Sequence, residues 1–116
     1  MGYYTYFNFE ARPVDICNTE GIKTSMKKLS SRMDELGVFE EMWTEKDETV
    51  LYCCGDAKWY DWEADMRTIS AEFPEFVFHM GGDGEERDDL WEAHFLAGRM
   101  QYCPATLAPY DPRKMT

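Results

Sequence analysis

The sequence predicts an α+β fold, a two-layer sandwich in which two helices cover one face of a mostly antiparallel sheet. Two segments place apolar residues at helical spacing, and six short segments alternate apolar with polar residues or are dense in aromatic and β-branched residues. The 116 residues suffice for one hydrophobic core without disulfides or a metal, and they contain no internal repeat. We therefore expect one domain over residues 1–116.

The N-terminal part predicts a strand followed by a helix. Residues 3–10 are rich in aromatic side chains, which favours a strand, and Arg12 and Pro13 are expected to break it. Apolar residues then recur at steps of four, three, four and three, the period of one helical face: Ile22, Met26, Leu29, Met33 and Leu36. Gly37 is expected to end this helix.

The middle of the chain predicts a hairpin and a second helix. Residues 38–43 and 49–54 are expected to be strands joined by the polar turn 45–48, with Gly55 and Asp56 ending the second strand. Asp61 is a suitable N-cap for the second helix. The apolar stripe of that helix consists of Trp62, Met66, Ile69 and Phe73. Pro74 follows and should stop it.

Three further strands are expected at residues 76–80, 90–95 and 99–105. Between the first two, residues 81–89 hold three glycines and five carboxylates, so this segment is expected to be a solvated loop. Ala97 and Gly98 should turn the last two strands. The predicted order is β-α-β-β-α-β-β-β, a variant of the split βαβ or ferredoxin-like arrangement.

The charge is concentrated in residues 40–92. This segment holds 17 of the 23 acidic residues and four basic ones, a net charge of −13, while the remainder carries six acids and eight bases; the sum is −11. Such an excess repels itself and attracts positively charged surfaces. We expect this segment to form an acidic face that binds a basic protein surface.

Direct binding of nucleic acid is not expected. Two features would favour nucleic-acid binding. One is the aromatic first strand, and the other is a basic strip on the first helix, formed by Lys23, Lys27, Lys28 and Arg32. However, every phosphate contact would be made against the negative field of the whole molecule.

The chain is expected to be cytoplasmic, in the cytosol of a host cell. No apolar run approaches the roughly 18 residues that span a bilayer, and the N-terminus lacks a signal peptide, so no membrane is expected as a partner. The cysteines, Cys17, Cys53, Cys54 and Cys103, are expected to be reduced thiols that behave as small hydrophobic residues. We expect no cofactor and assign no metal ligand.

Aromatic residues crowd the start of the second helix. Trp59, Tyr60 and Trp62 occupy three of four positions and cannot all face one core, so at least one is expected at the surface. Aromatic side chains rimmed by charge are typical binding anchors. We therefore include these three residues and Trp91 among the candidate partner-binding residues.

The acidic glycine segment supplies the other candidates. Its carboxylates are Asp83, Glu85, Glu86, Asp88 and Asp89. Their spacing does not match an EF-hand, because Gly84 follows Asp83 directly and His94 stands where the last glutamate ligand would be. A solvated hairpin tip, a partner contact and a divalent cation site all stay open, and the first is the most ordinary.

His79 and His94 lie on strands expected to be neighbours, so they can approach each other and Cys103. A hydrolase needs a nucleophile, a base and an orienting acid within hydrogen-bond reach. No spacing of residues in the sequence indicates such a set. A small metal- or thiol-dependent enzyme at these residues is the alternative.

One region resembles a pattern in small uncharacterised proteins of phages and bacterial mobile elements. The residues that carry the resemblance lie within residues 58–100: Trp59-Tyr60-Asp61, Glu63, Asp65, Met66, Phe73-Pro74, Phe78, Gly82-Asp83-Gly84-Glu85-Glu86, Asp89, Trp91, Phe95 and Gly98. The resemblance implies a phage-related origin and assigns no activity to a residue. Small acidic phage proteins are often inhibitors of host defence.

The sequence thus leads us to expect a non-enzymatic, phage-type inhibitor. It would block a basic surface of a host nucleic-acid-handling defence protein, of the anti-CRISPR or anti-restriction class. An assembly or regulatory subunit that forms a homodimer through a sheet edge is a further alternative.

Overall fold

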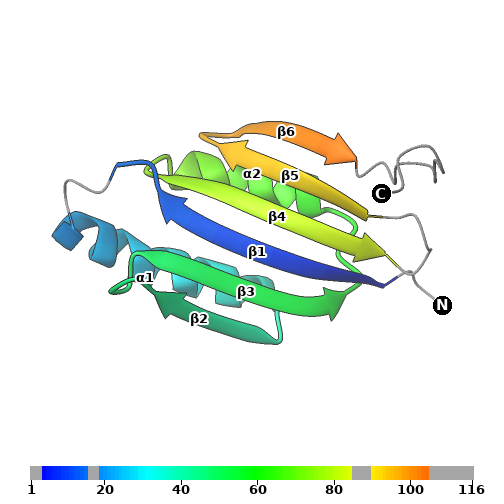
Figure 1. Ribbon diagram of the computed structural model, residues 1–116, viewed down its shortest axis with the longest axis horizontal. Coiled ribbons are helices and arrows are strands. Elements are labelled where there is room, and N and C mark those ends of the chain that lie inside the picture. Colours follow the sequence, from blue (N-terminus) through cyan, green and yellow to red (C-terminus); the bar gives the residue numbers. More distant parts are fainter. Residues whose placement is uncertain (1–3, 16–18, 85–89, 105–116) are drawn as a thin grey trace, which may run out of the picture.

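The computed structural model describes residues 4–15, 19–84 and 90–104 (Figure 1). Its elements follow in the order β1 (Thr5–Pro13), α1 (Thr19–Leu36), β2 (Glu41–Glu45), β3 (Val50–Ala57), α2 (Trp62–Glu72), β4 (Phe76–Gly84), β5 (Leu90–Leu96) and β6 (Arg99–Pro104).

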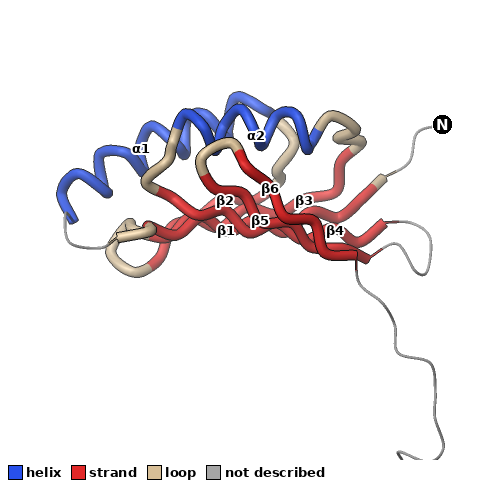
Figure 2. The backbone as a smooth tube through the Cα atoms, turned by 90° about the horizontal axis from the view of Figure 1, so that it is seen from above, coloured by secondary structure: helices blue, strands red, loops and turns tan. Residues whose placement is uncertain are grey.

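One six-stranded sheet organises the described residues. Its strand order is β2-β3-β1-β4-β5-β6, and every neighbouring pair is antiparallel. Both helices lie on the same face of the sheet, so the described part of the chain forms two layers and leaves the other sheet face without a helix (Figure 2). The α+β class, the antiparallel sheet and the two covering helices are confirmed.

β1 is the central strand and shows how the sequence separates the two faces. Phe7, Phe9 and Ala11 are buried beneath the helices, whereas Tyr6 and Asn8, which alternate with them, are exposed on the open face. Successive strand side chains point to opposite faces, so this alternation places the core on one side only.

The helices bury the stripes that their periodicity predicts. In α1, Ile22, Met26, Leu29 and Met33 are buried, and Gly37 follows with a φ of +66°, the left-handed conformation that ends a helix. In α2, Met66 and Ile69 are buried. Asp61 stands at the N-cap position but makes no side-chain capping hydrogen bond.

Two expected strand ends are wrong. Arg12 and Pro13 continue β1 because they pair with Val77 and Phe76 of β4. Gly55 and Asp56 continue β3 because they pair with Phe7 and Tyr6 of β1. In both places a neighbouring strand supplies backbone hydrogen bonds that outweigh the local preference for a break.

The first half of the expected glycine loop is also a strand. Residues 81–84 belong to β4 and pair with residues 5–8 of β1, while residues 85–89 lie outside the described residues. Gly82 is buried where the Trp91 indole of β5 lies against it, and a Cβ at Gly82 would overlap that ring. Here a glycine serves close packing rather than a turn.

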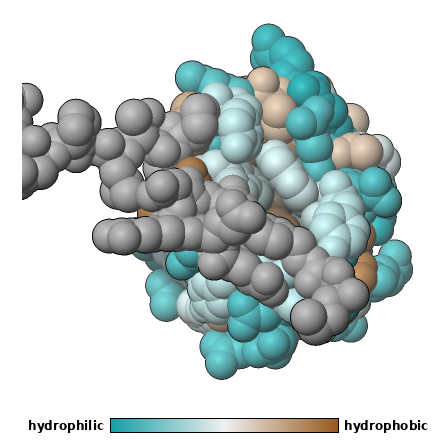
Figure 3. Space-filling view, turned by 90° about the vertical axis from the view of Figure 1, so that its right-hand side faces the viewer, coloured by the Kyte–Doolittle hydropathy of each residue, from teal (hydrophilic) through white to brown (hydrophobic). Residues whose placement is uncertain are grey.

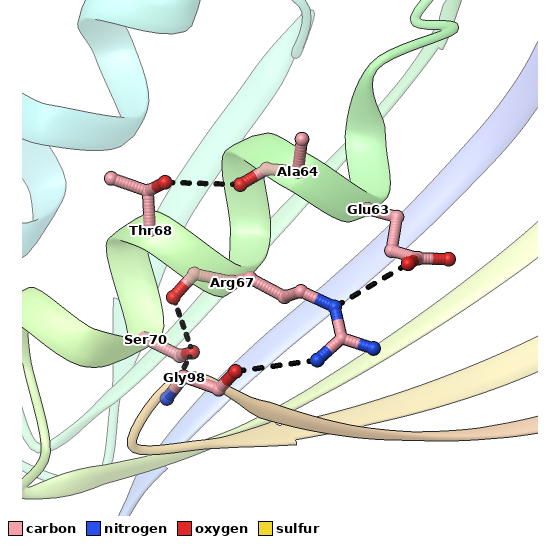
Figure 4. Close-up of polar contacts among 6 residues, drawn as sticks. All are labelled: Glu63, Ala64, Arg67, Thr68, Ser70 and Gly98. Carbon is pink, nitrogen blue, oxygen red and sulfur yellow. Dashed lines mark hydrogen bonds and ion pairs between the residues drawn. The ribbon is translucent and has the colours of Figure 1, made fainter.

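α2 is attached to the β5–β6 turn by a small polar network (Figure 4). The Gly98 N–H donates to Ser70 Oγ at 2.9 Å, Ser70 Oγ donates to the Arg67 carbonyl at 3.1 Å, and Arg67 Nη1 donates to the Gly98 carbonyl at 3.4 Å. Ser70 is buried, and because its hydroxyl both donates and accepts a hydrogen bond here, it does not carry the cost of an unsatisfied polar group.

Among the described helices, neither is long and apolar enough to cross a bilayer.

Alanine substitutions at Gly82 and Gly81 distinguish the effect of a clash with the Trp91 ring from the effect of losing a glycine in a strand. We expect Gly82→Ala to lower the free energy of unfolding by about 1–3 kcal/mol, because its methyl group displaces the Trp91 ring. Gly81→Ala is the matched control: its methyl group would meet no heavy atom closer than 3.9 Å. We expect that variant to be unchanged or up to about 1 kcal/mol more stable, because alanine loses less backbone entropy. Urea denaturation measures both, and equal effects would contradict this packing.

Candidate functional site

The open face of the sheet is rich in carboxylates (Figure 1 looks onto this face). The strand register and alternation place six of them there: Glu10, Glu41, Glu45, Asp56, Asp83 and Glu92. Arg12 and Arg99 lie on the same face, and Arg12 pairs with Glu10. Trp43 and Tyr52 stack across β2 and β3 with ring centroids 5.5 Å apart.

The carboxylates of residues 40–92 do not share one face, contrary to the expectation. The segment includes strands that point side chains away from the helices and α2, which lies in the helix layer. Glu63 and Glu72 of α2 pair with Arg67 and Arg32 at 3.3 and 3.2 Å. The two helices together hold six acids and five bases, so the helix layer is nearly neutral and the excess of carboxylates lies mainly elsewhere.

An aromatic pocket lies at the end of the sheet where β1 begins and α2 starts. Its volume is about 250 Å³. Its lining consists of Thr5, Phe7, Trp59, Tyr60, Trp62, Trp91 and Tyr102. Figure 3 views this end of the molecule and shows mainly hydrophilic residues among its coloured atoms, with hydrophobic ones between them.

Ring stacking gives the pocket its shape. Trp62 stacks on Trp91 with centroids 4.2 Å apart and planes at 17°, and Tyr102 lies within 6.3 Å of both rings. Phe7 meets Trp59 edge to face at 5.3 Å. Edge-to-face and offset stacked pairs are the favourable geometries for aromatic rings.

A hydrogen bond holds one buried wall of the pocket, the Trp59 ring. Trp59 Nε1 donates to Asp65 Oδ2 at 2.7 Å, from one turn along α2. The bond satisfies the indole N–H in a partly buried place and fixes the ring orientation.

The structure brings the four predicted aromatic residues into this one pocket but gives them different roles. Trp59 and Trp91 are each only 7% exposed, so they are core walls and cannot be surface anchors. Tyr60 is 65% exposed and Trp62 is half-buried, so these two can meet a partner. Tyr102 was missed; its alternation with Met100 on β6 was the available signal.

The acidic candidates are only partly described. Asp83 is exposed on β4, where it pairs with Tyr6 and Leu90. The other four candidates, Glu85, Glu86, Asp88 and Asp89, lie outside the described residues.

A second cluster lies on the open face, where β4 and β5 place the two histidines side by side. His79 and His94 are cross-strand partners with ring centroids 4.7 Å apart. Glu92 Oε1 lies 3.7 Å from His79 Nε2, and one ligand atom from each of the three residues falls within 4.8 Å of the others. Cys103 is the cross-strand partner of Glu92. Glu92 was missed, although it shares a strand face with His94.

The adjacent cysteines point to opposite faces, as expected. Cys53 is buried in the core, and burial raises the pKa of its thiol to about 12, whereas Cys54 lies on the open face. Cys17 lies outside the described residues. A thiol with so high a pKa is a poor nucleophile, so Cys53 is not a candidate for thiol chemistry.

Comparison of the chain with family models, with curated proteins and with solved structures finds no match.

The thiols should differ in reactivity. At pH 8 the thiolate fraction of Cys53 is only about 10⁻⁴ for a pKa of about 12. We expect an alkylating reagent to modify Cys53 at least about 100-fold more slowly than Cys54 or Cys103 in the folded protein, and at an equal rate in urea. Peptide mapping over a time course measures this, and rapid labelling of Cys53 under native conditions would contradict its burial.

Proposed function

We propose that this protein is a non-enzymatic binding protein that captures a basic surface of another protein. The aromatic pocket receives an arginine or lysine side chain of that partner. The observation that supports the proposal most directly is an aromatic-lined pocket on a chain whose net charge is −11. Cations bind over the faces of Trp and Tyr, and a negative field concentrates them at the surface.

The size of the pocket favours a side chain over a small-molecule ligand. Its volume of about 250 Å³ is below the roughly 300–1,000 Å³ of typical small-molecule sites. Trp62 and Tyr102 offer stacked rings at the opening, and a planar guanidinium stacks well on such rings.

A contact of the proposed kind already exists near the pocket. Lys58 Nζ lies 4.8 Å from the centroid of the Tyr4 ring, at the end of the sheet where Thr5 lines the pocket. Ammonium groups within about 6 Å of a ring centroid are attracted by its quadrupole.

The pocket alone cannot supply high affinity. A cation–π contact contributes about 0.5–2 kcal/mol, which is at most a factor of about 30. The rest of the binding free energy must come from attraction between opposite charges on the two proteins. Asp61 lies exposed beside the pocket, and Asp83 lies exposed on β4, where it pairs with Tyr6.

For the partner, we propose a nucleic-acid-handling protein of host defence. Surfaces that neutralise phosphates are built from lysine and arginine, the residues that this pocket and charge would attract. An acidic protein on such a surface would exclude the nucleic acid by occupying it.

For the architecture, we propose a ferredoxin-like variant. β1, α1, β2, β3, α2 and β4 follow in the βαββαβ order, and their strands lie in the sheet order β2-β3-β1-β4. β5 and β6 extend the sheet beyond β4 as a hairpin. Each helix then connects two parallel strands that flank a third, as in a split βαβ unit.

Pocket variants test the proposal with a fluorescent nona-arginine peptide as the probe. We expect Tyr60→Ala and Trp62→Ala each to weaken binding by about threefold to thirtyfold, because each removes a cation–π surface. Trp43→Ala is the matched control. Trp43 is also an exposed tryptophan in a stacked pair, 42% exposed, but it lies on the open face at the far edge of the sheet.

Fluorescence anisotropy measures the affinities, and thermal unfolding verifies that each variant is folded. If Tyr60→Ala and Trp62→Ala bind the peptide with wild-type affinity, or if Trp43→Ala loses as much affinity as they do, the pocket is not the binding site.

Salt dependence tests the contribution of charge. We expect the affinity for the arginine peptide to fall at least about tenfold between 50 and 300 mM NaCl, because exposed charges are screened over a shorter distance at higher ionic strength. A nona-glutamate peptide should not bind. Affinity that is constant across this range would show that the acidic excess does not drive binding.

A further inference from the structure

Both histidines of the chain come together in one place. The sequence contains two, 15 positions apart, and the β4–β5 register makes them direct cross-strand partners on the open face. Glu92 adds a carboxylate two residues before His94, on the same face of the same strand. Three side chains with metal-binding atoms therefore project from two paired strands.

The distances fit a small cation after minor rotation of the side chains. In a tetrahedral zinc site, bonds of about 2.0–2.1 Å place neighbouring ligand atoms about 3.3 Å apart. His79 Nε2 and Glu92 Oε1 are 3.7 Å apart, and all three ligand atoms lie within 4.8 Å of one another. Both histidines and Glu92 are near the surface, where their side chains have room to turn.

We propose that His79, Glu92 and His94 bind a divalent transition metal of the zinc type. Two imidazoles select such a metal over Mg²⁺ or Ca²⁺, which prefer oxygen ligands. Three protein ligands leave at least one coordination position for water or for a donor atom of a partner.

The surroundings of the cluster support this assignment. Glu10 pairs with His79 and Gln101 pairs with His94, so a carboxylate and an amide flank the histidine pair in the same cross-strand row. Such groups orient imidazole ligands when they accept their second N–H. The strands also fix the backbone of all three ligands through sheet hydrogen bonds, which favours a well-defined site.

A hollow lies beside Glu92, the one residue of the cluster that lines it. It has a volume of about 450 Å³ and is lined in part by Asn8, Gly81, Glu92 and Cys103. Gly81 has no side chain to fill it, since even an added Cβ would have no neighbour closer than 3.9 Å. The side chains of His79 and Glu92 are 40% and 59% exposed, so a metal held between them would be accessible from solvent.

The metal site and the aromatic pocket are separate. Trp91 and Glu92 are consecutive in β5 and point to opposite faces, the first into the pocket and the second into the cluster. Removal of one site should leave the other intact, so each proposal can fail without the other.

The test uses the full chain, freed of metal with a chelator, and ZnCl₂ as the probe in isothermal titration calorimetry. We expect one zinc per chain and no binding of MgCl₂ under the same conditions. His79→Ala and His94→Ala should each weaken zinc binding by about 100-fold or more, since even loss of an outer-sphere partner costs about 10–100-fold. In NMR spectra, zinc should shift the imidazole signals of both histidines together.

Matched variants distinguish a zinc ion held by this cluster from one held by general negative charge or by the thiols. Glu92→Gln should weaken zinc binding by at least about tenfold, whereas Glu41→Gln, which removes the same charge from the opposite edge of the same face, should leave it within about twofold. Thermal unfolding without zinc verifies that each variant is folded. Absence of saturable zinc binding would overturn the proposal, as would binding that survives in the His79→Ala/His94→Ala double variant and is lost when the thiols are blocked.

Discussion

The packing of the Trp91 indole on Gly82 is the interaction on which the rest of the structure depends. It occurs between β4 and β5 on the covered face, where only a glycine leaves room for the ring. A shift of one residue between these strands would exchange the faces of every β5 side chain relative to β4. The contact therefore selects a single register for the strand pair.

That register creates both candidate sites. On the covered side it places Trp91 beside Trp62 and Phe7 in the aromatic pocket, and on the open side it places His79 beside His94. A strand alternates its side chains between faces, so one pairing can organise two unrelated chemistries within two consecutive residues. Packing of Trp91 in the core thus determines, through the strand register, that His79 and His94 lie side by side on the opposite face of the sheet.

The charge of the molecule acts at longer range than either site. Arg12, Lys23, Arg32 and Arg67 each pair with one carboxylate among the described residues, yet exposed pairs of this kind contribute little to stability. The acids on the open face, such as Glu41, Asp56 and Asp83, outnumber the nearby arginines. The excess therefore gives the molecule a negative field and contributes little to folding.

Local patterns in the sequence determined the element types, because periodicity and helix-ending residues act within a few positions. The stripe of α1 and its end at Gly37 could be predicted this way, and so could a surface position for at least one of three crowded aromatic residues, which the structure gives to Tyr60. The tertiary structure alone decided that residues 81–84 form a strand, that Trp59 and Trp91 are buried, and that Glu92 and Tyr102 join the two sites. Alternation could show which face of its own strand Tyr102 or Glu92 occupies, but not which strands lie side by side or in what register. Packing between residues distant in the chain sets the strand order and the register.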